Sequence, residues 1–141
     1  MADFVNFHFD IDGENFTSAG EASVRIKKML REMGFTPDVI RRVSVAMYEG
    51  EINMVIHANG GSADVNVFCD RIEIILADRG PGISNIELAM QEGYSTAPDN
   101  VRSLGFGAGM GLPNMKRYTD DMKIESVVGE GTTITMTVLL A

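Results

Sequence analysis

One predicted helix constrains the fold of this chain most, because its apolar side chains point in almost every direction. It begins with Thr36 as N-cap and Pro37 at the first helical position, and it runs to about Ala58, before Gly60 and Gly61. Its apolar residues are Val39, Ile40, Val43, Val45, Met47, Ile52, Met54, Val55 and Ile56. A helix that is apolar all round is buried, so we expect other elements to cover most of its sides.

One polar line interrupts this helix. Arg42 lies on it, and Glu49, Asn53 and His57 follow at intervals of four residues, so the last three stack on one face. The line is either a strip exposed to solvent or a row of buried polar groups that a ligand and a metal ion would pair. Glu51 points elsewhere, and we expect it to be solvated or in a salt bridge.

The remaining elements predict one sheet. Strands are expected at residues 4–11, 63–69, 72–78, 122–127 and 132–140, and further helices at 18–33 and 110–119, with a short helical piece near 86–91. The first strand is expected at a sheet edge. This order predicts an α/β sandwich of the α+β class, in which helices cover one face of a mostly antiparallel sheet. With 141 residues, the chain is expected to form a single domain over residues 1–141.

Composition excludes several classes of function. The net charge of −8 argues against non-specific nucleic-acid binding, although Arg41, Arg42, Lys116 and Arg117 could form a local basic cluster. The single cysteine, Cys69, cannot form a disulfide framework and is predicted to be a core residue of a strand. No signal peptide or membrane span is visible, so we expect a cytoplasmic protein without a membrane partner.

The segment Asp78-x-Gly80-x-Gly82 closes an apolar strand. Asp78 has the same parity as the apolar residues before it, so its carboxylate is expected on the inward face, where it could accept a hydrogen bond from the exocyclic amine of adenine. Gly80 and Gly82 would let the following turn pass close to a flat ring. The alternative is a plain Asp-x-Gly turn in which Pro81 fixes φ.

A second glycine segment precedes the last helix. Gly105, Gly107, Gly109 and Gly111 alternate, and such a segment at a helix start allows backbone N–H groups to approach an anion closely. No Gly-Lys-Ser/Thr follows, so this is not a Walker loop. A hinge is the alternative. The preceding stretch, about residues 91–108, is long and rich in Gly, Ser, Pro and Asn, which predicts a mobile lid.

The three segments together carry a resemblance. Glu49-x-x-x-Asn53, Asp78-x-Gly80-x-Gly82 and Gly107-x-Gly109-x-Gly111 resemble the N, G1 and G2 boxes of the histidine-kinase-like (GHKL) ATPase superfamily, which has the Bergerat ATP-binding fold. The small size and the segment after Gly109 look most like the anti-sigma-factor serine/threonine kinases of the RsbT, RsbW and SpoIIAB type. The ending from Gly111 to Asp120 resembles the RsbT type more than the SpoIIAB type.

The resemblance implies a site for ATP and Mg²⁺. Asn53 would give its side-chain oxygen to Mg²⁺, and Glu49 would be the general base. Asp78 would bind the adenine amine with Gly82 near the base and Thr132 beside Asp78. The phosphates would be wrapped by the glycine segment, with two further residues at the start of the helix that follows: Gly105, Gly107, Gly109 and Gly111, then Met110 and Leu112.

The resemblance also implies a function and leaves alternatives. A protein serine/threonine kinase would act on an anti-sigma-factor antagonist with a STAS fold. A sigma factor is a further candidate partner, and a homodimer is a candidate assembly. The alternative is a nucleotide-sensing binding module without productive transfer. The chain has no dimerisation helix with a phosphoacceptor histidine, so a histidine autokinase is not expected. The glycine segment has no cation, which leaves Arg102, Lys116 and Arg117 as candidates to neutralise the γ-phosphate.

Overall fold

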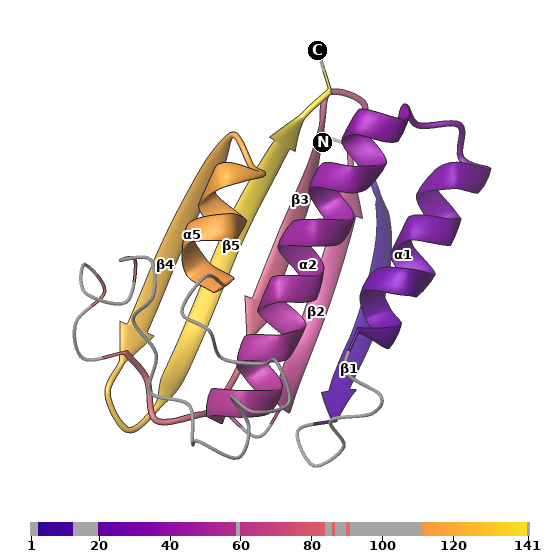
Figure 1. Ribbon diagram of the computed structural model, residues 1–141. Helices are drawn as coiled ribbons and strands as arrows, with labels where there is room; N and C mark the ends of the chain where they lie inside the picture. The colour runs from indigo at the N-terminus through magenta and orange to yellow at the C-terminus, as the bar shows by residue number, and fades with distance from the viewer. Residues whose placement is uncertain are drawn as a thin grey trace.

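Five strands and three helices make up the part of the chain that this computed structural model describes, residues 3–12, 20–58, 60–83, 86, 90 and 111–140 (Figure 1). The elements follow in the order β1 (Val5–Asp12), α1 (Glu21–Glu32), α2 (Pro37–Ala58), β2 (Gly60–Val67), β3 (Arg71–Ala77), α5 (Gly111–Arg117), β4 (Asp121–Val127) and β5 (Gly131–Leu139). This is the order that the sequence predicts. The predicted lid at 91–108 lies outside the described residues.

The strands form one sheet in the order β1-β2-β3-β5-β4, and every neighbouring pair is antiparallel. β1 is an edge strand, as predicted. All three helices lie on one face of the sheet (Figure 1). The predicted α+β sandwich is therefore confirmed, with a sheet that is antiparallel throughout its described strands.

α2 lies at the centre of the helical layer, as its apolar surface predicts. Its start is also as predicted, because Thr36 Oγ1 accepts a hydrogen bond from Val39 N over 3.3 Å. Three residues of α2, Val43, Ala46 and Met47, are fully buried, as are Ile72 and Ile74 of β3. The alternating burial of β3 and β5 places one side of each strand in this core.

A glycine in the middle of α2 allows the helix to approach the sheet closely. A Cβ on Gly50 would overlap Leu76 Cδ1 of β3, which is itself almost fully buried. Glycine costs about 1 kcal/mol relative to alanine inside a helix. Here that cost is offset by contact between the helix backbone and the core.

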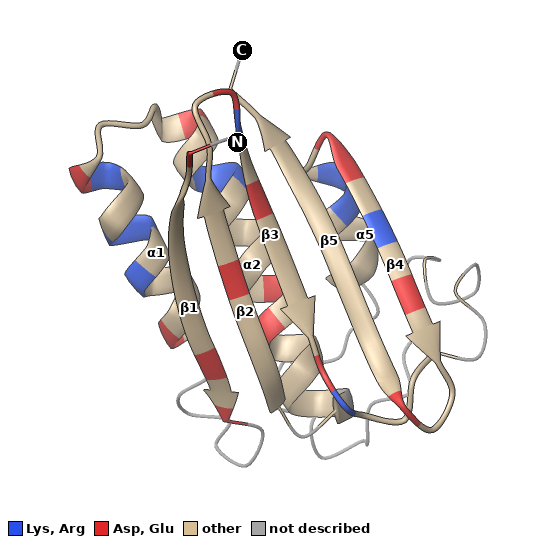
Figure 2. Cartoon of the chain, turned by 180° about the vertical axis from the view of Figure 1, so that it is seen from behind, with Lys and Arg blue, Asp and Glu red and all other residues tan. Residues whose placement is uncertain are grey.

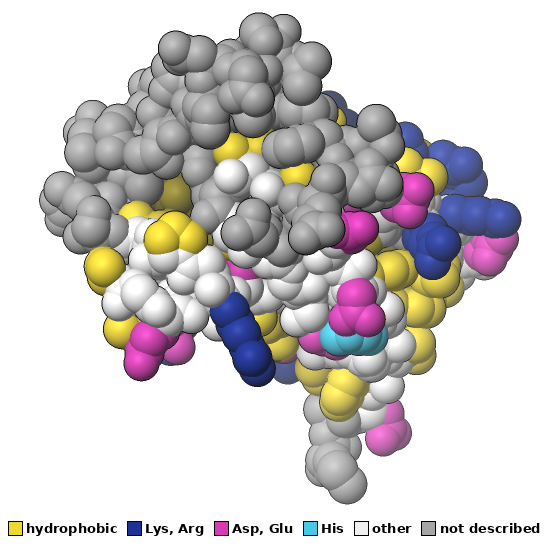
Figure 3. All heavy atoms as spheres, turned by 90° about the horizontal axis from the view of Figure 1, so that it is seen from below, with side chains coloured by type: hydrophobic (Ala, Val, Ile, Leu, Met, Phe, Trp, Pro, Cys, Tyr) yellow, Lys and Arg dark blue, Asp and Glu magenta, His cyan; other side chains and the backbone are white. Residues whose placement is uncertain are grey.

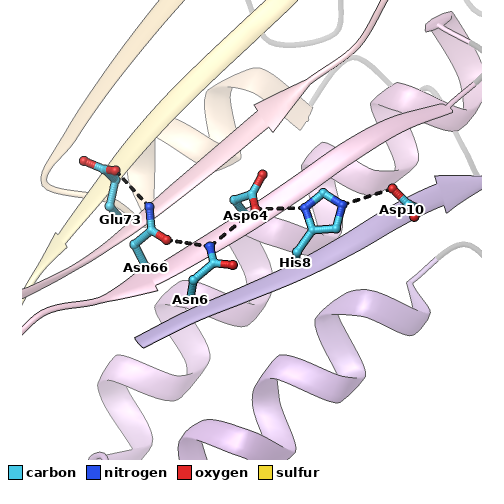
Figure 4. Close-up of polar contacts among 6 residues, drawn as sticks. All are labelled: Asn6, His8, Asp10, Asp64, Asn66 and Glu73. Atoms are coloured by element: carbon cyan, nitrogen blue, oxygen red, sulfur yellow. Dashed lines mark hydrogen bonds and ion pairs between the residues drawn. The ribbon is translucent and has the colours of Figure 1, made fainter. Parts of the chain in front are cut away.

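None of the described helices lies over the opposite face of the sheet, which carries polar side chains (Figure 2). His8 bonds Asp64 over 2.8 Å and Asp10 over 3.1 Å, and these carboxylates raise the pKa of His8. Asn66 accepts a hydrogen bond from Asn6 Nδ2 over 2.7 Å and donates one to Glu73 over 3.3 Å (Figure 4). A sheet that is apolar on one face and polar on the other is typical of antiparallel sheets with one solvated face.

Cys69 corrects one expectation. It is exposed, and it lies in the bend between β2 and β3 rather than in a strand core. β2 ends at Val67, so the alternation that predicted burial does not extend as far as residue 69.

Candidate functional site

The predicted site residues that are described gather at one end of the sandwich, the lower end in Figure 1. This end holds the C-terminal half of α2, the start of α5, the end of β3 and the start of β5. The topology brings them together because β3 and β5 are antiparallel neighbours, so that Ala77 pairs with Thr133.

Asn53 lies directly against the first residue of α5. A Cβ on Gly111 would stand 2.9 Å from Asn53 Oδ1 and 3.0 Å from Nδ2, so only glycine leaves the amide this space. The structure thus joins the predicted Asn53 and the last glycine of the second glycine segment, which are 58 positions apart in the sequence. Leu112, the next residue, is buried in the core.

Glu49 lies one turn before Asn53 and is half-buried. Burial raises the pKa of its carboxyl, and a hydrogen bond with the Asn114 side chain of α5 partly opposes that rise. A carboxylate with a raised pKa, on the same helical face as an amide, is suited to act as a general base. The polar line of α2 is therefore partly covered by α5 at these positions and is not a freely solvated strip.

Asp78 follows β3 and is held by two backbone N–H groups. Its Oδ1 accepts hydrogen bonds from Gly80 N over 2.9 Å and from Thr132 N over 3.2 Å. Thr132 thus lies beside Asp78, where the resemblance implies it. A Cβ on Gly80 would stand 2.5 Å from Ala58 Cβ, so this turn is pressed against the end of α2.

The turn also packs against the β4–β5 hairpin. Gly82 has φ of 77°, and a Cβ there would stand 2.6 Å from the carbonyl oxygen of Val127. Ile83 N donates to Ser126 Oγ over 2.7 Å, and Ser126 Oγ lies 2.8 Å from Thr132 Oγ1. Ser126 was not predicted from the sequence, because a serine in a strand of mixed polarity has no distinctive pattern.

Arg42 does not join Glu49 and Asn53. It forms an ion pair with Asp120 over 2.7 Å and donates to the carbonyl oxygen of Tyr118 over 3.2 Å. Arg41 lies over the Tyr118 ring, 5.7 Å from its centroid. These two arginines, which the sequence predicted in a local basic cluster, therefore tie α2 to the end of α5.

Glu51 is a second residue whose expected surroundings were wrong. It is 1% exposed, and it accepts hydrogen bonds from three backbone N–H groups at the start of α1: Gly20 over 3.0 Å, Ala22 over 3.2 Å and Ser23 over 2.6 Å. Burial raises the pKa of Glu51, and these three bonds oppose the rise. The signal for it was present, because a carboxylate on an otherwise apolar face of a buried helix needs partners.

Several predicted positions lie outside the described residues. These are Gly105, Gly107, Gly109, Met110, Arg102 and the side chain of His57. Lys116 and Arg117 are described, and both are exposed in the last turn of α5.

The family follows from a sequence match that spans most of the chain. Residues 15–138 match the family described as the histidine kinase-like ATPase domain. The chain belongs to this family. ATP is the nucleotide that membership implies, and the predicted superfamily is thereby confirmed.

Two relatives indicate which kind of member of the family the chain is similar to in sequence. The serine/threonine-protein kinase RsbT of Bacillus subtilis is 34% identical over 112 residues, which cover 77% of this chain and 78% of RsbT. An anti-sigma F factor of Clostridium acetobutylicum is 36% identical over 120 residues, covering 82% of this chain and 80% of that protein. The predicted kinship with anti-sigma-factor kinases is therefore confirmed.

Solved structures confirm the fold. The RsbU and RsbW domains of Rv1364c from Mycobacterium tuberculosis match with a TM-score of 0.65 at 18% identity, covering 96% of this chain and 32% of that one. The mycobacterial sensor histidine kinase MprB matches with a TM-score of 0.54 at 17% identity, covering 96% and 97%. Within the described part of the chain, no helix combines the length and the apolar character that crossing a membrane requires.

Proposed function

We propose that this protein is an ATP- and Mg²⁺-dependent protein serine/threonine kinase. The observation that carries the proposal is the face that α2 turns toward α5, where Glu49 is half-buried with a raised pKa and Asn53 lies one turn further on, against Gly111. Phosphoryl transfer needs little beyond positioning and charge neutralisation, and an oriented base for the acceptor hydroxyl completes that set. The kinase name of the relative RsbT supports the same reading.

Mg²⁺ fits the donors that the chain offers. The described residues contain no group of three or more His, Cys, Asp or Glu side chains able to hold a metal ion. Mg²⁺ in phosphoryl-transfer sites typically takes one or two protein oxygens and completes its octahedron with phosphates and water. Asn53 Oδ1, with space left by the missing Cβ of Gly111, is suited to be that oxygen. Asn53 would hold the ion there, and the chemistry that the ion would supply is neutralisation of phosphate charge.

The remaining residues would hold the nucleotide. Asp78, kept in place by Gly80 N and Thr132 N, would accept the hydrogen bond from the adenine amine. Gly80 and Gly82 would lie close to the base. The segment from Gly105 to Gly111, with Met110 in it and Leu112 directly after it, would present backbone N–H groups to the phosphates. Residues 91–108 would close over them as a lid.

The partner would be another protein of a bacterial partner-switching system. We propose an anti-sigma-factor antagonist with a STAS domain as the phosphorylated partner and a sigma factor as a second partner, with the kinase acting in the cytoplasm and able to form a homodimer. The anti-sigma F factors among the relatives support this class of partner.

A second function is favoured by those same relatives. Several are named only as anti-sigma F factors, so the chain could bind its partner under the control of ATP without transferring phosphate. The position of Glu49 favours the kinase, because a pure binding module has no need of a base at that point.

Phosphate transfer from γ-³²P-ATP separates the two functions. Candidate STAS-domain proteins encoded by neighbouring genes would be incubated with the chain, with Glu49→Gln, and with Glu125→Gln, an exposed carboxylate in an ion pair with Lys123 on the other face of the sheet. A kinase labels its partner, loses labelling in Glu49→Gln and keeps it in Glu125→Gln. Nucleotide-dependent partner binding without any labelling would establish the binding module instead.

A further inference from the structure

An open groove lies between α1 and α2, on the side of α2 away from Glu49 and α5. It has a volume of about 350 Å³ and is lined by Gly20, Glu21, Val24, Arg25 and Tyr48. Val24 is 67% exposed and Tyr48 is 41% exposed, so two large hydrophobic side chains border a concave surface. Single exposed apolar residues are ordinary, but an apolar groove is a common feature of docking sites.

The floor of the groove is a close contact between a side chain of α2 and the backbone before α1. Gly20 has φ of 98°, and a Cβ there would stand 2.9 Å from Tyr48 Cε1, so the Tyr48 ring lies directly on the backbone that precedes α1. Glu51, fully buried behind it, fixes the same backbone through Gly20 N, Ala22 N and Ser23 N. Nothing in the proposed phosphoryl transfer requires this carboxylate, and its hydrogen bonds hold the backbone that lines the groove.

The solvent side of α1 is positively charged. Its exposed cations are Arg25, Lys27, Lys28 and Arg31, flanked by Glu21 in the first turn and Glu32 at the end. Val24 and Lys28 are four residues apart and lie on one line of the helix, so the apolar border continues into the cations. Lys and Arg gather along α1 in Figure 2, and the dark-blue side chains at the right of Figure 3 show the same edge of the molecule. A third of the 12 basic residues of a chain with net charge −8 thus stand on one helix.

We propose that this groove and the cations of α1 form the docking site for an acidic segment of the partner protein, with an apolar side chain of that segment inserted between Val24 and Tyr48. Opposite charge selects the segment and speeds its encounter, while the apolar contact supplies affinity and register. The inference deepens the proposed function and rests on it for the identity of the partner. Tyr48 and Glu49 are adjacent in the sequence but point to different sides of α2, so docking here would hold the partner against α2 without covering the proposed base.

A fluorescent peptide tests the docking site without nucleotide. The probe is a short labelled peptide with one leucine and one phenylalanine among glutamates, and its binding is followed by fluorescence anisotropy. We expect saturable binding that weakens with salt, because exposed charges are screened over about 8–10 Å at physiological ionic strength. A matched peptide with glutamine in place of every glutamate should bind at least about threefold more weakly.

Variants of the chain test whether the peptide binds at the groove and the cations of α1. Arg25→Glu and Lys28→Glu should each weaken the acidic peptide about three- to tenfold, and Val24→Ser should weaken it about threefold by removing apolar contact. Lys123→Glu makes the same charge change on the opposite face and should leave affinity within twofold. Glu49→Gln should bind the peptide as the unchanged chain does, so that failure of the kinase proposal remains distinguishable from failure of this one.

Three results would overturn the proposal. One is absence of saturable binding, and another is equal weakening by Lys123→Glu and Arg25→Glu. The third is a dimer in sedimentation that Arg25→Glu and Val24→Ser both dissociate, since the groove would then be occupied by a second copy of the chain.

Discussion

Glu49 and Glu51 are two positions apart on α2, but their surroundings differ, and we infer different roles for them. Glu51 points toward α1, is 1% exposed, and has both oxygens engaged by backbone N–H groups. Glu49 points toward α5, is half-buried, and has its pKa raised by burial with an opposing hydrogen bond from Asn114. One helix therefore separates a structural carboxylate from a candidate catalytic one by a rotation of about 200°.

The role of a buried acid depends on which groups satisfy its oxygens. A carboxylate whose hydrogen-bonding capacity is met by fixed backbone groups stabilises the fold and has little capacity left for a substrate. A carboxylate that is desolvated but held mainly by one side chain can exchange that partner for a ligand or a proton. The comparison predicts that changes at 49 affect chemistry and changes at 51 affect stability.

Glu49→Gln gives the largest expected effect. The amide keeps the shape of the side chain but cannot accept the hydroxyl proton, so phosphate transfer should fall by about 10²–10⁴-fold while ATP still binds. Transfer rates and calorimetric ATP titration measure the two quantities. Transfer at the unchanged rate would remove Glu49 from the role of base and make the two carboxylates equivalent.

Glu51→Ala should act on stability instead. Removing the carboxylate leaves three buried N–H donors at the start of α1 without their acceptor, which we expect to lower the free energy of unfolding by about 2–4 kcal/mol. Denaturant unfolding measures this, with Glu21→Ala, an exposed acid in the first turn of α1, as the control that should cost less than about 1 kcal/mol. Equal losses in the two variants would contradict the capping role.

Asn53→Ala should remove the part of ATP affinity that depends on Mg²⁺, by about 10–100-fold, with little effect on stability because Asn53 is half-buried. Calorimetric titrations with and without Mg²⁺ measure it. Asn66→Ala, an amide on the open face of the sheet, is the matched control and should leave ATP affinity unchanged. A loss of affinity that is the same with and without Mg²⁺ would place Asn53 outside the metal site.

The raised pKa of Glu49 should also appear in the pH dependence of phosphate transfer and of stability. A general base acts when ionised, and burial raises the pKa of Glu49, so transfer should decline as pH falls through a value above the usual glutamate value of about 4.3. A folded-state pKa above the unfolded value gives a contribution to stability that is present below the unfolded pKa and lost as pH rises through the folded one. Glu49→Gln should therefore make the free energy of unfolding less dependent on pH between the unfolded and the folded pKa of Glu49. An acid limb at the ordinary glutamate pKa would contradict the desolvation of Glu49.

Sequence periodicity was sufficient to predict the layers, the strand order along the chain and the N-cap of α2. It also drew attention to Glu49, Asn53 and Asp78, because each is a polar residue in an apolar pattern, and their roles in the site stay predictions. It could not place Glu51, because its partners are backbone N–H groups whose position depends on how α1 docks against α2. Cys69 was wrong for a local reason, since alternation was extended two residues past the end of β2.

Gly50, which lies between the two carboxylates, offers the smallest and sharpest test. Gly50→Ala should gain about 1 kcal/mol in helix propensity and lose about 1–3 kcal/mol because its Cβ overlaps Leu76 Cδ1 in a packed core. We expect a net loss near 1 kcal/mol in unfolding free energy and a small shift of α2 away from β3. Leu76→Val in the same chain should relieve the overlap, so a double-mutant cycle should show a favourable coupling of about 1 kcal/mol. A stabilising effect of Gly50→Ala without the second change would show that the close approach of α2 to β3 does not fix the rotation of α2. The hydrogen bonds of Glu51 alone would then keep Glu49 facing α5 and Glu51 facing α1.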